Sequence, residues 1–143
     1  MLEECKNKNI AKELILHNLE ECPIPLKKND FDVVISCAVF HLINPIQPVF
    51  SEIKRLLKPN GVFIFTFENT EDVSGYSEIE TGVWEQKTKT GVFCYKHAER
   101  YIFNRLKQSS FKIEKQKTFL AYTNSELQKH FYFTAIVARL QPE

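Results

Sequence analysis

The chain is short of glycine, of net charge and of long apolar runs. Only 4 of its 143 residues are glycine, and 19 lysines and arginines nearly balance 18 aspartates and glutamates. Because the charges nearly cancel, the chain has no overall electrostatic field that would attract nucleic acid or an anionic membrane. We therefore expect neither as a partner. No stretch approaches the roughly eighteen consecutive apolar residues of a membrane-spanning helix, which predicts a chain without one.

Cysteine is scattered rather than clustered. Cys5, Cys22, Cys37 and Cys94 show no Cys-x-x-Cys spacing, so the sequence predicts no metal site. The segment Met1–Asn9 is too charged for a secretory signal peptide, which favours a cytoplasmic protein with reduced thiols. Cys37 lies inside an apolar run, and we expect it to be a small buried residue.

The length and the aromatic content bound the architecture. At 143 residues the chain can form one domain with a sizeable core, and its 12 phenylalanines predict that this core is densely aromatic.

A strand–helix–strand pattern occupies the middle of the sequence. Asp32–Ser36 and Val62–Phe67 are rich in valine, isoleucine and phenylalanine, which is typical of parallel strands buried on both faces. Between them, apolar residues at three- and four-residue spacing predict an amphipathic helix over Pro48–Leu57. Lys58–Gly61 contains proline and Asn-Gly and predicts a turn. Because such units bind ligands at the carboxyl ends of their strands, we expect chemistry near Ser36–Ala38.

The flanking segments are less regular. Glu68–Thr90 is polar and without sustained periodicity, so residues 69–95 are interpreted as a long loop or lid above the site. The other predicted elements are the tail of a helix at Met1–Asn9, a short buried strand at Leu14–Leu16, a helix over Lys96–Ser110, and strands at Phe111–Gln116 and His130–Leu140.

Three sequence segments resemble those of a known family. Phe31–Ser36, Val39–Leu42 and Glu52–Gly61 resemble, in register, the second half of a class I S-adenosylmethionine-dependent methyltransferase of the type 11-like group. The resemblance implies an α/β, Rossmann-like sheet, mostly parallel, with a C-terminal antiparallel hairpin whose last strand lies beside the fifth. It also implies S-adenosyl-L-methionine as cofactor and methyl transfer to an unidentified small-molecule or protein acceptor.

The resemblance further implies which residues line the cofactor. Asn18 and Leu19 match the pair that holds the adenine in the family, with Glu20 as a competing match one turn later. An asparagine amide oxygen can accept the same hydrogen bond as the usual aspartate, but without charge. The alternative is that Asn18 and Glu20 only cap or line a solvated loop. Ser36, Cys37 and Ala38 match the segment that passes the methionine end of the cofactor.

On the substrate side, His41 falls on a position that is often histidine in the family. It is a candidate general base or positioning group, because imidazole titrates near neutral pH. Alternatively, its ring packs on Phe40 or Leu42. Tyr76 and Tyr95 are candidate substrate contacts.

One part of the family pattern has no counterpart. The family binds the ribose and carboxypropyl groups with a first βαβ unit that carries a glycine-rich loop, whereas the four glycines here, at 61, 75, 82 and 91, are not spaced for one. The chain therefore resembles a partial domain, strands three to seven, lacking that unit. We expect a fragment, a homodimer or partner-completed domain, or a degenerate relative. A non-catalytic protein-interaction module is the alternative function.

Overall fold

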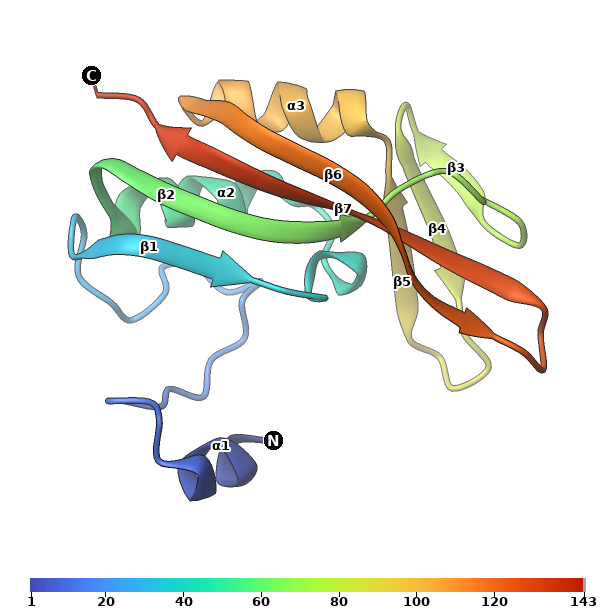
Figure 1. Ribbon diagram of the computed structural model, residues 1–143, viewed down its shortest axis with the longest axis horizontal. Coiled ribbons are helices and arrows are strands. Elements are labelled where there is room, and N and C mark those ends of the chain that lie inside the picture. The colour runs from blue at the N-terminus through green and yellow to red at the C-terminus, as the bar shows by residue number, and fades with distance from the viewer. Residues whose placement is uncertain (143) are drawn as a thin grey trace.

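The structure is a computed structural model that describes residues 1–142 (Figure 1). In chain order its elements are α1 (Leu2–Lys8), β1 (Phe31–Ser36), the 3-10 helix η1 (Phe40–Leu42), α2 (Gln47–Leu56), β2 (Leu57–Glu68), β3 (Ser77–Glu80), β4 (Val83–Lys87), β5 (Phe93–His97), α3 (Glu99–Gln108), β6 (Phe111–Asn124) and β7 (Lys129–Leu140).

The main sheet has the strand order β1-β2-β7-β6. β1 and β2 run parallel and are joined through η1 and α2, which confirms the predicted strand–helix–strand unit. β7 is antiparallel to both of its neighbours and lies between β2 and β6, as the family resemblance implies. The sheet is therefore mixed, and the expectation of a mostly parallel sheet does not hold for the described strands.

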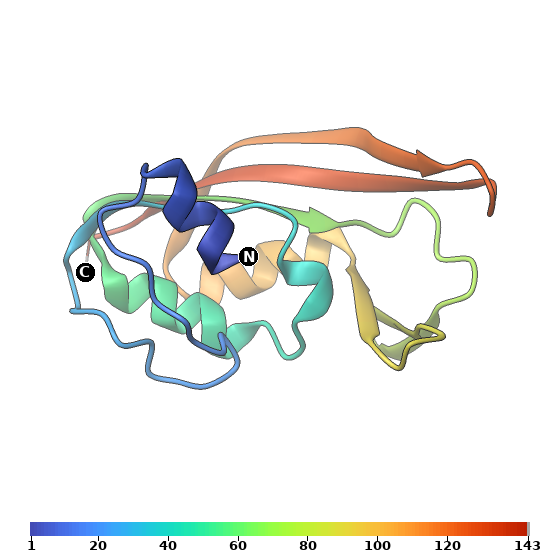
Figure 2. The same ribbon diagram turned by 90° about the horizontal axis from the view of Figure 1, so that it is seen from below.

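The core lies between this sheet and two helices. Figure 2 shows α2 and α3 on the same side of the sheet. α2 turns one apolar face inward, because its apolar residues recur at helical spacing. Five phenylalanines are fully buried. Phe40, Phe50, Phe63 and Phe65 contact one another edge-on or stacked, and Phe67 lies beside Phe65.

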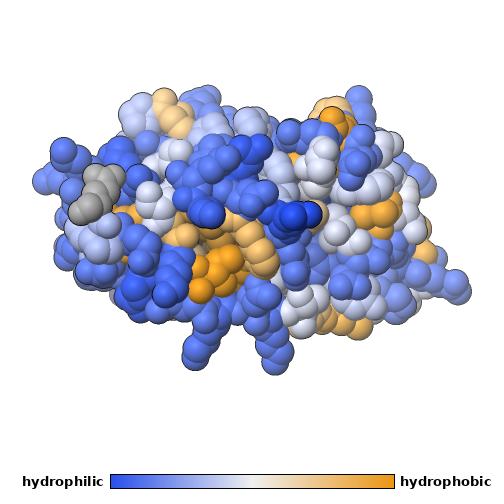
Figure 3. Space-filling view, turned by 90° about the horizontal axis from the view of Figure 1, so that it is seen from above, coloured by the Kyte–Doolittle hydropathy of each residue, from blue (hydrophilic) through white to orange (hydrophobic). Residues whose placement is uncertain are grey.

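The opposite face of β1 is uncovered. Val33 is 46 % exposed and Ile35 is 64 % exposed, so the prediction that this strand is buried on both faces is wrong. Cys37 is also exposed, contrary to expectation. On the face shown in Figure 3, hydrophilic side chains surround a central apolar patch, and smaller apolar areas lie towards the rim.

Three further expectations are corrected. Leu14–Leu16 forms no strand and lies in an extended segment without sheet pairing. β2 begins at Leu57, so the expected turn at Lys58–Gly61 falls within the strand. Residues 69–95, predicted as one long loop, contain a three-stranded antiparallel sheet of order β3-β4-β5, whose first turn uses Gly82 at a φ of 86°. Local sequence showed no period there because these strands are only four or five residues long, and β3 is exposed throughout.

Across residues 1–142, every helix is too short or too polar to span a membrane.

Candidate functional site

The turn after β1 is fixed by a side chain from β2. Ala38 has a φ of 55°, in the left-handed region that few residues other than glycine adopt. Its N–H donates a hydrogen bond of 2.9 Å to Thr66 Oγ1. This bond holds the segment Ser36–Ala38 against the neighbouring strand, with the Cys37 side chain exposed. The hydrogen bond thus joins the carboxyl ends of β1 and β2 at one edge of the sheet.

His41 lies on η1, directly after this turn. Its neighbour Phe40 anchors the short helix in the core, where it is 1 % exposed. The His41 ring centroid is 6.1 Å from that of Phe133 on β7, and its buried Nδ1 has no hydrogen-bond partner among residues 1–142. Burial lowers the pKa of His41, so the ring is neutral at neutral pH. A neutral imidazole with a free nitrogen can accept a proton or a hydrogen bond.

The adenine candidates lie in a turn before β1. Asn18 Oδ1 accepts a hydrogen bond of 3.0 Å from the backbone N–H of Glu20, and Leu19 is 37 % exposed. The amide oxygen of Asn18 is thus used within its own turn. Glu20, the competing match, lines a cavity of about 370 Å³ together with Asn44 and Tyr95.

The two tyrosine candidates are separated by the small sheet. Successive side chains of β5 point to opposite faces, so Tyr95 and Lys96 lie on different sides. The Tyr76 ring lies on the Lys96 side, with its centroid 4.6 Å from Lys96 Nζ. Burial raises the pKa of both tyrosines, far above the ordinary range for Tyr76. The structure does not bring Tyr76 and Tyr95 together.

A buried ion pair lies at the end of β2, and the sequence analysis did not predict it. Glu68, 3 % exposed, and Lys96, 4 % exposed, lie with Oε1 and Nζ 3.5 Å apart. Burial raises the pKa of Glu68, and the charge of Lys96 opposes this rise. The position of Glu68 at a strand's carboxyl end was a signal, but its partner is 28 residues away and has no local pattern.

The first part of the chain is similar to a known protein family. Residues 1–65 match the family described as "Methyltransferase domain". The resemblance to the methyltransferase family is confirmed. The matched residues include Asn18, Ser36–Ala38 and His41, whereas Tyr76 and Tyr95 lie beyond them.

A relative with a different printed name matches a short part of the chain. A protein named "Arginine-hydroxylase NDUFAF5, mitochondrial" from Dictyostelium discoideum is 36% identical over 52 residues, which are 36% of this chain and 12% of that relative. The aligned part is thus a small fraction of the relative's length.

Two solved structures share the methyltransferase fold at low sequence identity. An S-adenosylmethionine-dependent methyltransferase from Mesorhizobium loti has a TM-score of 0.67 at 20% identity, covering 86% of this chain and 67% of that one. The 1,6-didemethyltoxoflavin-N1-methyltransferase of Burkholderia thailandensis, solved with S-adenosylhomocysteine, has a TM-score of 0.63 at 14% identity, covering 90% of this chain and 50% of that one.

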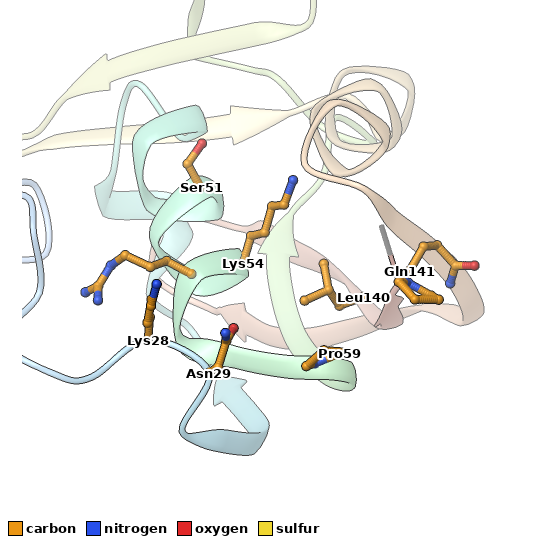
Figure 4. Close-up of a pocket in the computed structure, with 9 residues that line it drawn as sticks. Lys28, Asn29, Ser51, Lys54, Pro59, Leu140 and Gln141 are labelled. Carbon is orange, nitrogen blue, oxygen red and sulfur yellow. The ribbon is translucent and has the colours of Figure 1, made fainter.

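A second cavity, of about 500 Å³, is lined by residues on α2, near the start of β2 and at the end of β7 (Figure 4). Lys28, Lys54 and Arg55 line it, but Arg55 Nη2 forms an ion pair of 2.8 Å with Glu52 and donates to the carbonyl of Ile24. Arg55 therefore ties the segment before β1 to α2, which is a structural role. The described residues contain no cluster of three or more potential metal ligands.

Proposed function

We propose that this chain is part of an S-adenosylmethionine-dependent methyltransferase that transfers the methyl group to an oxygen or nitrogen of a small-molecule or protein acceptor. The observation that carries the proposal is the turn Ser36–Ala38, which Thr66 fixes at the carboxyl ends of two parallel strands. Open α/β sheets bind ligands at such ends.

The residues of this edge fit the cofactor in part. The left-handed turn at Ala38 brings backbone groups to the surface beside the exposed Cys37, which suits close approach of the methionine end. At the adenine side, Asn18 has its amide oxygen engaged by Glu20, so the carboxylate of Glu20 is the better available acceptor for an exocyclic amine.

S-adenosylmethionine supplies an electrophilic methyl group. The chain's own contribution is to position the acceptor and to receive its proton. His41, neutral and with Nδ1 free of hydrogen bonds among residues 1–142, is the candidate base, and Phe133 holds its ring from the side. Alignment of the reacting groups provides most of the rate enhancement in such a displacement.

The acceptor and the partners are proposals because the chain aligns with 12% of the curated relative. That relative is named a mitochondrial arginine hydroxylase, so cofactor-dependent chemistry other than methyl transfer is the second possibility.

A calorimetric titration of the chain with S-adenosylhomocysteine tests the proposal. We expect saturable binding, at micromolar dissociation constant if a second chain completes the site. Absence of heat at millimolar ligand would exclude cofactor binding by this chain. The mass in solution, measured on the same sample, separates a monomer from a dimer.

Replacing Thr66 by valine removes the hydrogen bond to Ala38 and keeps the side-chain shape. A lost hydrogen bond of this kind costs about 1 kcal/mol, so we expect affinity for S-adenosylhomocysteine to fall about fivefold. Thr118→Val on β6 is the matched control, because Thr118 contacts Thr134 and Glu99 rather than the turn, and its affinity should equal that of the wild type. Equal affinities of all three proteins would contradict the role given to Thr66.

A specific observation favours the alternative, a protein-interaction module. β1 pairs with β2 along one edge, while its other edge pairs with no described strand and its outward face exposes Val33 and Ile35. Such an edge attracts a partner strand. We expect a dimer by light scattering, and Ile35→Lys should shift the mass toward the monomer. A wild-type monomer at high micromolar concentration would contradict self-association.

A further inference from the structure

Lys96 is a buried cation, with only 4 % of its surface exposed. Its ammonium group pairs with Glu68 Oε1 at 3.5 Å and donates a hydrogen bond to the backbone carbonyl of Asp72. It also lies over two aromatic rings, 4.6 Å from the centroid of Tyr76 and 5.6 Å from that of Phe131. These four partners come from β2, from the loop 69–76 and from β7.

Burial makes this arrangement costly unless it is complete. A lysine ammonium taken out of water must be compensated by an opposite charge and by acceptors. Glu68 supplies the charge, and the Asp72 carbonyl and the Tyr76 ring supply the rest. The two loop groups therefore replace part of the water that would otherwise solvate the Lys96 ammonium.

Hydrogen bonds also hold the two ends of the loop 69–76. Asn69 holds the start of the loop through Thr134, at 3.0 Å, and Gln86 holds the end through the Gly75 carbonyl, at 3.1 Å. Between these ends, Lys96 is the side chain from outside the loop that contacts Asp72 and Tyr76.

We propose that Lys96 is a positioning residue that holds the loop 69–76, and with it Tyr76, over the carboxyl end of β2, with Glu68 as its counter-ion. The relevance of this position to a substrate rests on the proposed function. The holding contact itself does not, since it is a property of the free chain.

The ionisable groups that surround the pair are few. Tyr76 from the loop, Cys94 from β5 and Tyr122 from β6 all interact electrostatically with Glu68, and each has its pKa raised, first by burial. These three groups are neutral at neutral pH. The Asp72 carboxyl, whose pKa is lowered first by hydrogen bonds with Ser74, is ionised and interacts with Lys96 and Lys129. Lys96 opposes the rise that burial causes in the pKa of Glu68, so its removal should raise this pKa further.

Hydrogen exchange of the free chain tests the proposal with the variant Lys96→Met, which keeps the length of the side chain and removes its charge. The reporters are the amides of Ser74 and Tyr76, which donate to Asp72 Oδ1 and to the Val73 carbonyl at 2.9 Å each. We expect these amides to exchange at least tenfold faster in the variant, because the loop opens locally without global unfolding. Lys96→Arg should restore much of the protection.

Two measurements separate positioning from a general loss of structure. Carbon-13 NMR of the glutamate carboxyls, assigned with Glu68→Gln, should show the Glu68 pKa higher in Lys96→Met than in the wild type. Lys87→Met, the same change on β4 where the ammonium lies over Phe93 at 5.6 Å, should alter neither loop exchange nor the Glu68 titration.

The outcomes are distinguishable from those of the proposed function. Unchanged exchange of Ser74 and Tyr76 in Lys96→Met would overturn the positioning role, whatever the affinity for S-adenosylhomocysteine. Faster exchange in Lys87→Met to the same degree would also overturn it. A wild-type chain that binds no S-adenosylhomocysteine would contradict the proposed function while leaving the exchange result intact.

Discussion

Phe65→Ala is expected to lower the free energy of unfolding by about 4 kcal/mol, which is in the range measured for phenylalanine truncation in cores. Phe65 is fully buried on β2, stacked on Phe63 at 4.4 Å between ring centroids and edge-on to Phe40 and Phe50 at 5.5 and 5.4 Å. Four aromatic rings surround Phe65, and its truncation leaves a cavity among them. Urea unfolding followed by circular dichroism measures the loss.

The matched control is Phe93→Ala on β5. Phe93 is 44 % exposed and contacts Lys87, so its truncation should cost less than about 1 kcal/mol. If the two variants lose similar stability, the phenylalanine layer under β2 is not the principal core.

Acidification is expected to destabilise the fold through His97. This side chain is fully buried, stacks on Tyr101 with 5.7 Å between ring centroids, and neither ring nitrogen has a hydrogen-bond partner among residues 1–142. Burial lowers the pKa of His97 to about 4. An unfolded histidine titrates near 6.5, so between these values the unfolded chain binds more protons than the folded one. Stability present above pH 6.5 is therefore lost as the pH falls toward 4, by about 3 kcal/mol.

His97→Phe isolates this contribution. The substituted ring keeps the stacking on Tyr101 and cannot be protonated, so the loss of stability between pH 6.5 and 4 should become smaller by about the same 3 kcal/mol. Urea midpoints measured at pH 7, 5.5 and 4.5 for both proteins provide the comparison. Parallel pH profiles would show that His97 is accessible to protons in the folded state.

The neighbours of His97 do not change the direction of this effect. Tyr95 and Tyr101, the rings beside it, both have a pKa raised by burial and stay neutral throughout this range. Glu68, whose pKa is raised, would take up protons in the folded state and oppose the loss, so the comparison with His97→Phe is needed.

Local sequence determined the elements that are long and periodic. The strand–helix–strand unit from Phe31 to Glu68 was predictable because apolar side chains recur at the period of each element, and the C-terminal strands because β6 and β7 begin in alternating or apolar runs. The sequence segments in this region that resemble the methyltransferase family also predicted the fold. Ser36–Ala38 followed from its place at the end of a strand and His41 from the family resemblance, and the structure places His41 on η1 directly after this turn.

The tertiary structure decided whatever depends on partners distant in sequence. The composition of Asp32–Ser36 predicts a strand buried on both faces. Burial depends on what covers the sheet, however, and nothing among residues 1–142 covers Val33 and Ile35. Leu14–Leu16 is apolar enough for a strand, yet a strand needs a neighbour to bond with, and it has none here.

The contacts of the candidate site show the same division. Tyr76 and Tyr95 are separated because β5 alternates its side chains across a sheet that no local period revealed. Lys96 lies at a position predicted to begin a helix, and its role arises because folding places it over Glu68 and Tyr76. The sequence alone determined the strands and the edge where chemistry is expected, through local periodicity. Only tertiary packing decided which charges are buried there, because burial and pairing are properties of surfaces that meet.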